Sequence, residues 1–170
     1  MLEDNFLGNL IRRGIPELIV LSAAVIFAVW LYGKISCRVY GGIDSRVVLL
    51  TSGTMLVGPF LIVNGIFKTF WGRARPRDID LFGGSKAFSL PLEISNQCAW
   101  DCSFMSGHTA VAFWLLAPAL LAPKKFRPFA VAAALLFGVT TAVFRIGQGA
   151  HFFSDVAFSA LVMSLLIVAV

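Results

Sequence analysis

The fold of this 170-residue chain is decided by a stretch in which two apolar runs flank a short polar connection, Phe126–Val170: FRPFAVAAALLFGVTTAVFRIGQGAHFFSDVAFSALVMSLLIVAV. Each run is long enough to cross a bilayer as a helix, which takes about 17 to 25 residues. The connection carries Arg145, His151 and Asp155. Ionisable groups are costly to keep at a membrane boundary, so these three residues indicate a functional site.

The same apolar pattern extends over the rest of the chain. Hydrophobic residues make up 58% and charged residues 14%, whereas about 25% are charged in an average soluble domain. The sequence therefore predicts one domain, residues 1–170, of the all-α class: a polytopic membrane helix bundle with about five transmembrane helices. We expect these spans at Ile15–Gly33, Val47–Phe67, Gly107–Pro123, Phe126–Phe144 and Phe152–Val170.

The first 14 residues mix charges of both signs with apolar residues. This mixture predicts a short helix lying in the membrane interface. The segment lacks the positive start and the small-residue cleavage site of a signal peptide.

Basic residues give the chain a formal charge of +5, but they are scattered over the loops between spans. This distribution argues against a nucleic-acid partner. Two connections on the same side of five alternating spans carry basic residues, namely Lys34, Arg38 and Arg46, and Lys124, Lys125 and Arg127. By the positive-inside rule this side is cytoplasmic, and the opposite side faces the periplasm or the exterior.

Two of the three cysteines, Cys98 and Cys102, lie four residues apart in the expected outer loop. An oxidising compartment permits a disulfide between them, and free thiols are the alternative. A zinc site built from these two cysteines and His108 lacks a clear fourth ligand, so we expect no metal. The loop itself, Trp71 to Met105, is long for a connection and is expected to be either a lid over a site or an irregular cap.

The first of three polar pieces lies where the second span ends. Lys68 and Arg75 stand about two helical turns apart, so both side chains are expected to face one ligand. An Arg fork and a Lys point charge together suit the oxygens of a phosphate dianion. Taken alone, each is better explained as a charged anchor snorkelling at a helix end.

The second piece, Ser106-Gly107-His108, begins the third span. Ser is a good helix N-cap, and Gly lets the backbone come close to a ligand. The free N–H groups and the dipole of a helix start bind phosphate oxygens. His108 is then placed to give a proton to a leaving group. A simple helix cap explains the triplet when it is considered alone.

The third piece joins the last two spans. His151 and Asp155 are four residues apart and share one face if the helix continues. The carboxylate would then accept from one ring nitrogen and leave the other free, as in a positioned nucleophile or base. Arg145 adds another cation. A His–Asp pair that only ties two helices together is the structural alternative.

Jointly, the three pieces resemble the signature of the type 2 phosphatidic acid phosphatase (PAP2) superfamily, which reads K-x6-RP, PSGH and SR-x5-H-x3-D. The order and both spacings agree with those in this sequence. Met105 stands where the family usually has Pro, and Phe144 where it usually has Ser. Neither residue type does phosphoryl or proton chemistry, so we expect these changes to alter loop geometry or substrate fit.

The resemblance implies a metal-independent phosphatase of a lipid phosphate, without a cofactor, in the bacterial inner membrane. It implies a phosphohistidine on His151, an orienting role for Asp155 and a general acid in His108. It also implies a set of phosphate-binding residues: Lys68, Arg75, Ser106, Gly107 and Arg145.

The expected partners are membrane lipids and a lipid phosphate such as a lipid A phosphate, phosphatidylglycerophosphate, phosphatidic acid or polyprenyl diphosphate. The Cys98-Ala-Trp-Asp-Cys102 segment looks like that of family members that include the lipid A phosphatases. A catalytically silent scaffold is the main alternative function. A transporter is less favoured because no span carries ionisable groups in its middle, and the related vanadium haloperoxidases are soluble.

Overall fold

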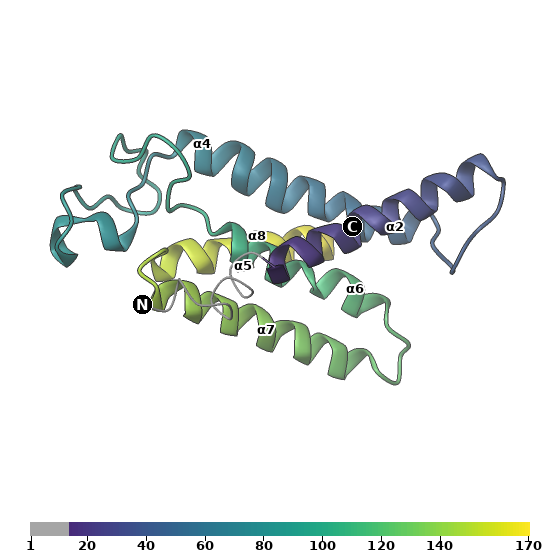
Figure 1. The fold of residues 1–170 in the computed structure, drawn as a ribbon. Helices are drawn as coiled ribbons and strands as arrows, with labels where there is room; N and C mark the ends of the chain where they lie inside the picture. Colours follow the sequence, from purple (N-terminus) through teal and green to yellow (C-terminus); the bar gives the residue numbers. More distant parts are fainter. Residues whose placement is uncertain (1–13) are drawn as a thin grey trace.

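The structure, a computed structural model, describes residues 14–170, so the helix expected over residues 1–14 lies almost wholly outside the described residues. Every regular element of residues 14–170 is a helix. This confirms the predicted all-α class. The long helices lie side by side as a bundle, with the irregular segments at its two ends (Figure 1).

A helix occurs at each of the five predicted spans, and the observed bounds differ from the predicted ones by no more than three residues. The helices are α2 (Ile15–Ile35), a continuous helix over Ser45–Phe70, α5 (Gly107–Trp114) followed by α6 (Leu116–Leu121), α7 (Arg127–Gly147) and α8 (Phe153–Ala169). Of the described helices, α2, Ser45–Phe70 and α7 are long and apolar enough to cross a membrane. The α5–α6 helix and α8 are apolar but shorter.

The Ser45–Phe70 helix is wound unevenly. It consists of α3 (Ser45–Val48), the π-helical stretches η2 (Leu49–Gly53) and η3 (Leu56–Phe67), and α4 (Lys68–Phe70). Pro59 lies inside it and lacks the N–H that an α-helical ladder needs, which favours the wider winding. The helix places Lys68 in its last turn, at the end of the bundle.

Helix α5 forms the centre of the bundle, because it packs against α2, η3, α7 and α8. Its residues from Thr109 to Trp114 are all buried. The Trp114 indole donates to the Thr51 carbonyl at 2.9 Å, which ties α5 to the π-helical stretch η2. Pro118 cannot donate to the carbonyl of Trp114, so the helix is interrupted between α5 and α6.

The outward faces of α2 and α7 are apolar. Large side chains such as Leu18, Phe27, Leu136 and Val143 are exposed. A soluble monomer rarely exposes apolar surface of this extent, whereas lipid tails cover it without cost. The chain is therefore an integral membrane protein.

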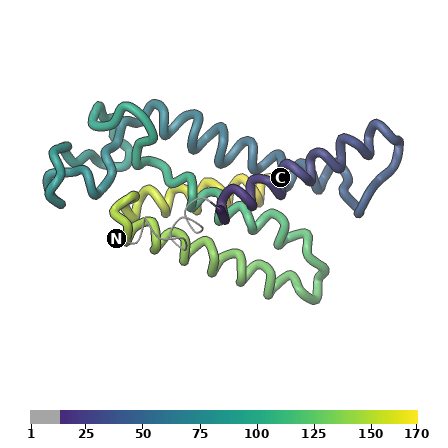
Figure 2. The backbone as a smooth tube through the Cα atoms, in the orientation of Figure 1, coloured from purple at the N-terminus to yellow at the C-terminus, as the bar shows by residue number. Residues whose placement is uncertain are grey.

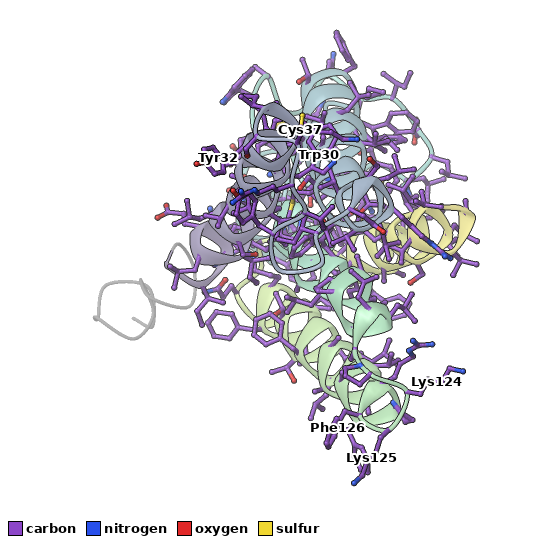
Figure 3. The ribbon with its side chains drawn as sticks, turned by 90° about the vertical axis from the view of Figure 1, so that its right-hand side faces the viewer. Trp30, Tyr32, Cys37, Lys124, Lys125 and Phe126 are labelled. Atoms are coloured by element: carbon purple, nitrogen blue, oxygen red, sulfur yellow. A yellow bond between two sulfur atoms is a disulfide. The ribbon has the colours of Figure 1, made fainter. Side chains whose placement is uncertain are left out.

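The two short basic connections, residues 36–44 and 122–126, both lie at the right-hand end in Figure 1. Figure 3 looks onto this end and shows Lys124 and Lys125 projecting from the body, with Cys37 across from them. The end of α4, the 71–106 segment and the α7–α8 connection lie at the opposite end (Figure 1). The three polar pieces therefore share one end of the bundle.

The 71–106 segment folds into an irregular mass beyond α4 (Figure 2). It contains two short 3-10 helices, η4 (Pro76–Asp78) and η5 (Asp80–Phe82). Its start is fixed at Gly72, whose φ is +65° and where an added Cβ would lie 1.6 Å from the Ser95 carbonyl oxygen. Cys98 and Cys102 form a disulfide with a Cα–Cα distance of 5.6 Å, which decides between the two alternatives for these two cysteines.

Candidate active site

His151 lies in the connection just before α8, and its side chain is buried. Its Nδ1 atom is 2.7 Å from the carbonyl oxygen of Ser103. A carbonyl oxygen only accepts, so Nδ1 carries the proton and Nε2 keeps its lone pair. No hydrogen-bond partner of Nε2 occurs among residues 14–170, and the ring borders a cavity of about 470 Å³ that Arg77 and Gly149 also line.

Asp155 is close to His151 but is held mainly by other groups. One carboxylate oxygen, Oδ2, lies 3.8 Å from His151 Nδ1 and accepts from Ser103 Oγ at 2.5 Å and from the Phe152 amide at 2.9 Å. The structure thus differs from the expected direct bond between carboxylate and imidazole. The reason is that α8 begins only at Phe153, so the two residues do not lie on one continuous helix.

Arg73 completes the surroundings of Asp155. Its guanidinium pairs with Asp155 Oδ1, donates to Ser154 Oγ at 2.9 Å and to the Ser89 carbonyl at 3.0 Å. Its Cζ atom lies 4.1 Å from the centre of the Phe152 ring, a cation–π contact. Both charged side chains are almost fully buried, so the pair joins the 71–106 segment to α8.

Lys68 and Arg75 both contact one group, a carboxylate of the chain, although the helix on which the spacing argument rested ends at Phe70. Asp101 accepts from Lys68 Nζ through Oδ1 and from Arg75 Nη2 through Oδ2 at 2.6 Å. The Asp101 carbonyl oxygen accepts from Arg75 as well, at 2.9 Å. Partial burial would raise the pKa of Asp101, but the hydrogen bond from Lys68 and the two positive charges outweigh burial and lower it.

The start of α5 lies against this cationic pair. An added Cβ on Gly107 would be 3.7 Å from Cε of Lys68 and 3.2 Å from the Asn64 amide oxygen. The helix start therefore lies beside Lys68, and the space at Gly107 is tight only toward Asn64. Ser106 is the N-cap of α5, because its Oγ accepts from the Thr109 amide at 3.4 Å.

Arg145 lies buried in the last turn of α7, and its Nη1 donates to Gln148 Oε1 at 2.7 Å. Burial, followed by the positive charges of Lys68 and Arg145, lowers the pKa of His151 from 6.5 to about 4, although Asp155 opposes the shift. His151 is thus neutral at pH 7. Cations from the first and third polar pieces thus both act on the charge of one imidazole.

His108, the second residue of α5, is half-buried. It borders another cavity, of about 290 Å³, between α2, α5 and α7. The rest of the lining is largely apolar and includes Phe144 and Thr141. The two histidines therefore border different cavities.

The sequence model of the PAP2 superfamily matches residues 46–170, which is most of the chain. The chain belongs to the PAP2 superfamily. The match covers all three polar pieces and the four helices that carry them, and it leaves out α2.

Three curated relatives of this PAP2 chain are each named lipid A 4'-phosphatase. The protein of Francisella tularensis subsp. novicida is 35% identical over 156 residues, which are 91% of this chain and 69% of that protein. The protein of Rhizobium leguminosarum is 44% identical over 61% of this chain and 45% of its own length. The Rhizobium etli protein is 38% identical over 66% of this chain and 44% of its own length. The chain thus spans less than half of the two rhizobial proteins, and no solved structure matches it.

The two departures from the PAP2 signature lie in different surroundings. Met105 is fully buried and belongs to the apolar core, where Phe104 and Trp114 also pack. Phe144 lines the cavity beside His108. Met105 therefore affects how the 71–106 segment joins α5, and Phe144 affects the shape of the space next to His108.

Sequence reasoning missed three contributors to this PAP2 site. None of Arg73, Asp101 and Ser103 was among the predicted site residues. The available signal was weak: two charged residues and a serine in the long loop, each near a signature residue in sequence. Their contacts depend on how that loop folds back over α8, which periodicity does not report.

Proposed function

We propose that this membrane protein, a lipid phosphatase of the PAP2 superfamily, removes a phosphate group from a lipid A head group through a phosphohistidine on His151. The observation that carries the proposal is the state of His151. The ring is neutral, its Nδ1 proton points to the Ser103 carbonyl, and Nε2 remains a buried nucleophile among cations. This is how an imidazole is prepared for attack on phosphorus.

In the first step, the Nε2 lone pair forms a bond to phosphorus while the bond from phosphorus to the sugar oxygen breaks. Protonated His108 gives its proton to that oxygen. Neutral His108 then takes a proton from water, whose oxygen bonds to phosphorus as the P–Nε2 bond breaks. Inorganic phosphate leaves, and both histidines return to their starting states.

The phosphoryl oxygens are held by the cationic pair Lys68 and Arg75, by Arg145, and by Ser106 and the Gly107 amide at the start of α5. Fixed positive groups of this kind stabilise the charge of the transition state. Asp155 acts as a positioning residue: through Ser103 it fixes the segment whose carbonyl orients His151.

Lipid A is favoured as the substrate class because all three relatives carry that activity in their names. The silent-scaffold alternative finds no support in those names. The proposed location is the bacterial inner membrane with the site facing the periplasm. The basic connections at the other end of the bundle support this orientation, and so does the disulfide beside the site, because disulfides persist in oxidising compartments.

The test uses the purified full chain in detergent micelles that contain lipid A, with release of inorganic phosphate as the readout. Brief incubation with lipid A labelled with ³²P is expected to leave an acid-labile, base-stable label on the protein. His151→Asn removes both the label and the activity. A labelled His151→Asn protein, or one with wild-type turnover, contradicts the mechanism.

The role of His108 is tested separately with a substrate that needs no general acid. His108→Ala is expected to lose about 10² to 10⁴-fold of its turnover on lipid A. On p-nitrophenyl phosphate, whose leaving group departs without a proton, it is expected to lose much less. Asp80→Asn, which changes an exposed carboxylate of the 71–106 segment, serves as the control and keeps wild-type rates on both substrates.

A further inference from the structure

The two cations at the end of the Ser45–Phe70 helix already hold an anion that belongs to the chain itself. One carboxylate oxygen of Asp101 accepts from Lys68 and the other accepts from Arg75. A bound phosphoryl group would be held in the same way, with one of its oxygens on each of the two positive side chains. The backbone carbonyl oxygen of Asp101 also accepts from Arg75.

The accessibility of the three side chains is unequal. Lys68 and Arg75 are only 13% and 12% exposed, whereas Asp101 is 57% exposed. The cations belong to the wall of the site, and the carboxylate approaches from the solvent side. A ligand that arrives from outside therefore meets Asp101 first and can displace it without moving a buried group.

A short closed loop presents this carboxylate. The Cys98–Cys102 disulfide closes it, and Cys102 is fully buried. The next residue, Ser103, is fixed because its amide donates to the Arg73 carbonyl at 2.9 Å. On the other side of Asp101 the side chain of Trp100 is 78% exposed. The loop is thus anchored at Cys102 and Ser103, while Trp100 and Asp101 lie on its solvent side.

We propose that Asp101 is an internal competitor for the phosphate position and that it makes the site select phosphomonoesters over phosphodiesters. The inference rests on the proposed function, because that function assigns Lys68 and Arg75 to the phosphate. A phosphomonoester carries a charge of about −1.5 to −2 at neutral pH, and it attracts two cations more strongly than a carboxylate does. A phosphodiester head group carries a single charge and gains no such advantage over Asp101.

At a membrane surface, competition from Asp101 keeps phosphodiester head groups away from Lys68 and Arg75. Phosphodiester lipids are abundant there, and an open cationic pair would bind their head groups unselectively. With Asp101 in place, only a dianionic head group displaces the resident carboxylate. Asp101 is then a specificity-determining residue that never touches the reacting atoms.

The test compares the full-length protein with Asp101→Asn, which removes the charge and keeps the shape. Orthovanadate is the probe, and its binding is measured by titration calorimetry in detergent. We expect Asp101→Asn to bind vanadate about tenfold more tightly, the change that corresponds to one well-made charged contact. Phosphatidylglycerol, a phosphodiester lipid, is expected to inhibit lipid A hydrolysis by this variant and not by the wild type.

Asp80→Asn is the matched control, because it removes one negative charge from an exposed position of the same segment. It is expected to bind vanadate as the wild type does. Asp101→Ser repeats the experiment if Asp101→Asn does not give a folded protein. Equal or weaker vanadate binding by the Asp101 variants overturns the proposal, since Asp101 would then position the cations. Absence of vanadate binding to every form overturns it too.

Failure of the proposed function and failure of the Asp101 competition give different results. If the wild type releases no phosphate from any lipid phosphate, but Asp101→Asn still binds vanadate more tightly than Asp80→Asn does, the competition stands and the lipid phosphatase assignment falls. If the wild type hydrolyses lipid A and the Asp101 variants bind vanadate no more tightly, the competition alone is wrong.

Discussion

The Nδ1 atom of His151 lies 2.7 Å from the carbonyl oxygen of Ser103, closer than to any carboxylate oxygen of Asp155, of which the nearer is at 3.8 Å. A neutral acceptor fixes the tautomer of the imidazole without favouring the imidazolium as a carboxylate would. Burial and the charges of Lys68 and Arg145 keep the ring neutral by lowering its pKa. The Ser103 carbonyl separately fixes the tautomer, with the proton on Nδ1.

Acid is expected to weaken the folded protein through His151. Its pKa is about 4 in the folded chain, below the ordinary 6.5, so the unfolded chain binds more protons between these two values. Stability contributed by the neutral ring is complete above pH 6.5 and is lost as the pH falls to about 4. Thermal unfolding of wild type and His151→Asn in detergent from pH 4 to 8 checks this, since the variant lacks this part of the pH dependence. Parallel curves across the window would contradict it.

Removing Arg73 is expected to destabilise the protein strongly. The change to Ala leaves the carboxylate of Asp155 buried without its cation, and breaking a buried pair in this way costs about 3 to 5 kcal/mol. Arg77→Ala is the comparison, because Arg77 is 46% exposed and its ion pair with Asp78 is 4.0 Å long. Melting temperatures of the two variants in the same detergent give the result. A smaller drop for Arg73→Ala than for Arg77→Ala would show that the buried pair is not structural.

Phe144 is expected to govern which lipids fit and not how fast phosphorus reacts. It lines the 290 Å³ cavity beside His108 and contributes no polar group there. Phe144→Ser enlarges that space, so KM for lipid A changes while turnover of p-nitrophenyl phosphate stays near the wild-type rate. Met105→Leu, a conservative change in the core, controls for a general loosening. Equal losses on both substrates would place Phe144 in the chemistry instead.

The orientation in the membrane is testable with the native cysteines. Cys37 is an exposed free cysteine at the end opposite the site, and the other two form the disulfide. In intact spheroplasts a membrane-impermeant maleimide is expected to leave the oxidised protein unlabelled. Permeabilisation exposes Cys37, and reduction in intact spheroplasts exposes Cys98 instead. Labelling of Cys37 before permeabilisation would reverse the proposed topology.

The helices were predictable because membrane spans need long apolar runs, and the five runs gave the bounds to within three residues. Lys68 and Arg75 contact one group, but not through the helical spacing on which the prediction rested, because the helix ends at Phe70 and Arg75 lies in extended backbone. The group between them was not predictable, because Asp101 reaches them through the fold of the 71–106 segment, which has almost no periodic structure. The expected Asp155–His151 bond differed for a related reason: the start of α8 at Phe153 breaks the helical geometry on which the spacing argument depends.

The pairing of Arg73 with Asp155 spans 82 residues of sequence, and this separation has a consequence for biosynthesis. While the ribosome delivers the first helices, Arg73 has no anionic partner from α8, and His151 has not yet been made. The guanidinium meets Asp155 only when α8 enters the bilayer, and the same event brings His151 to the Ser103 carbonyl. A nascent chain therefore forms the buried ion pair and the surroundings of His151 together, so the candidate site is assembled only once α8 is in place.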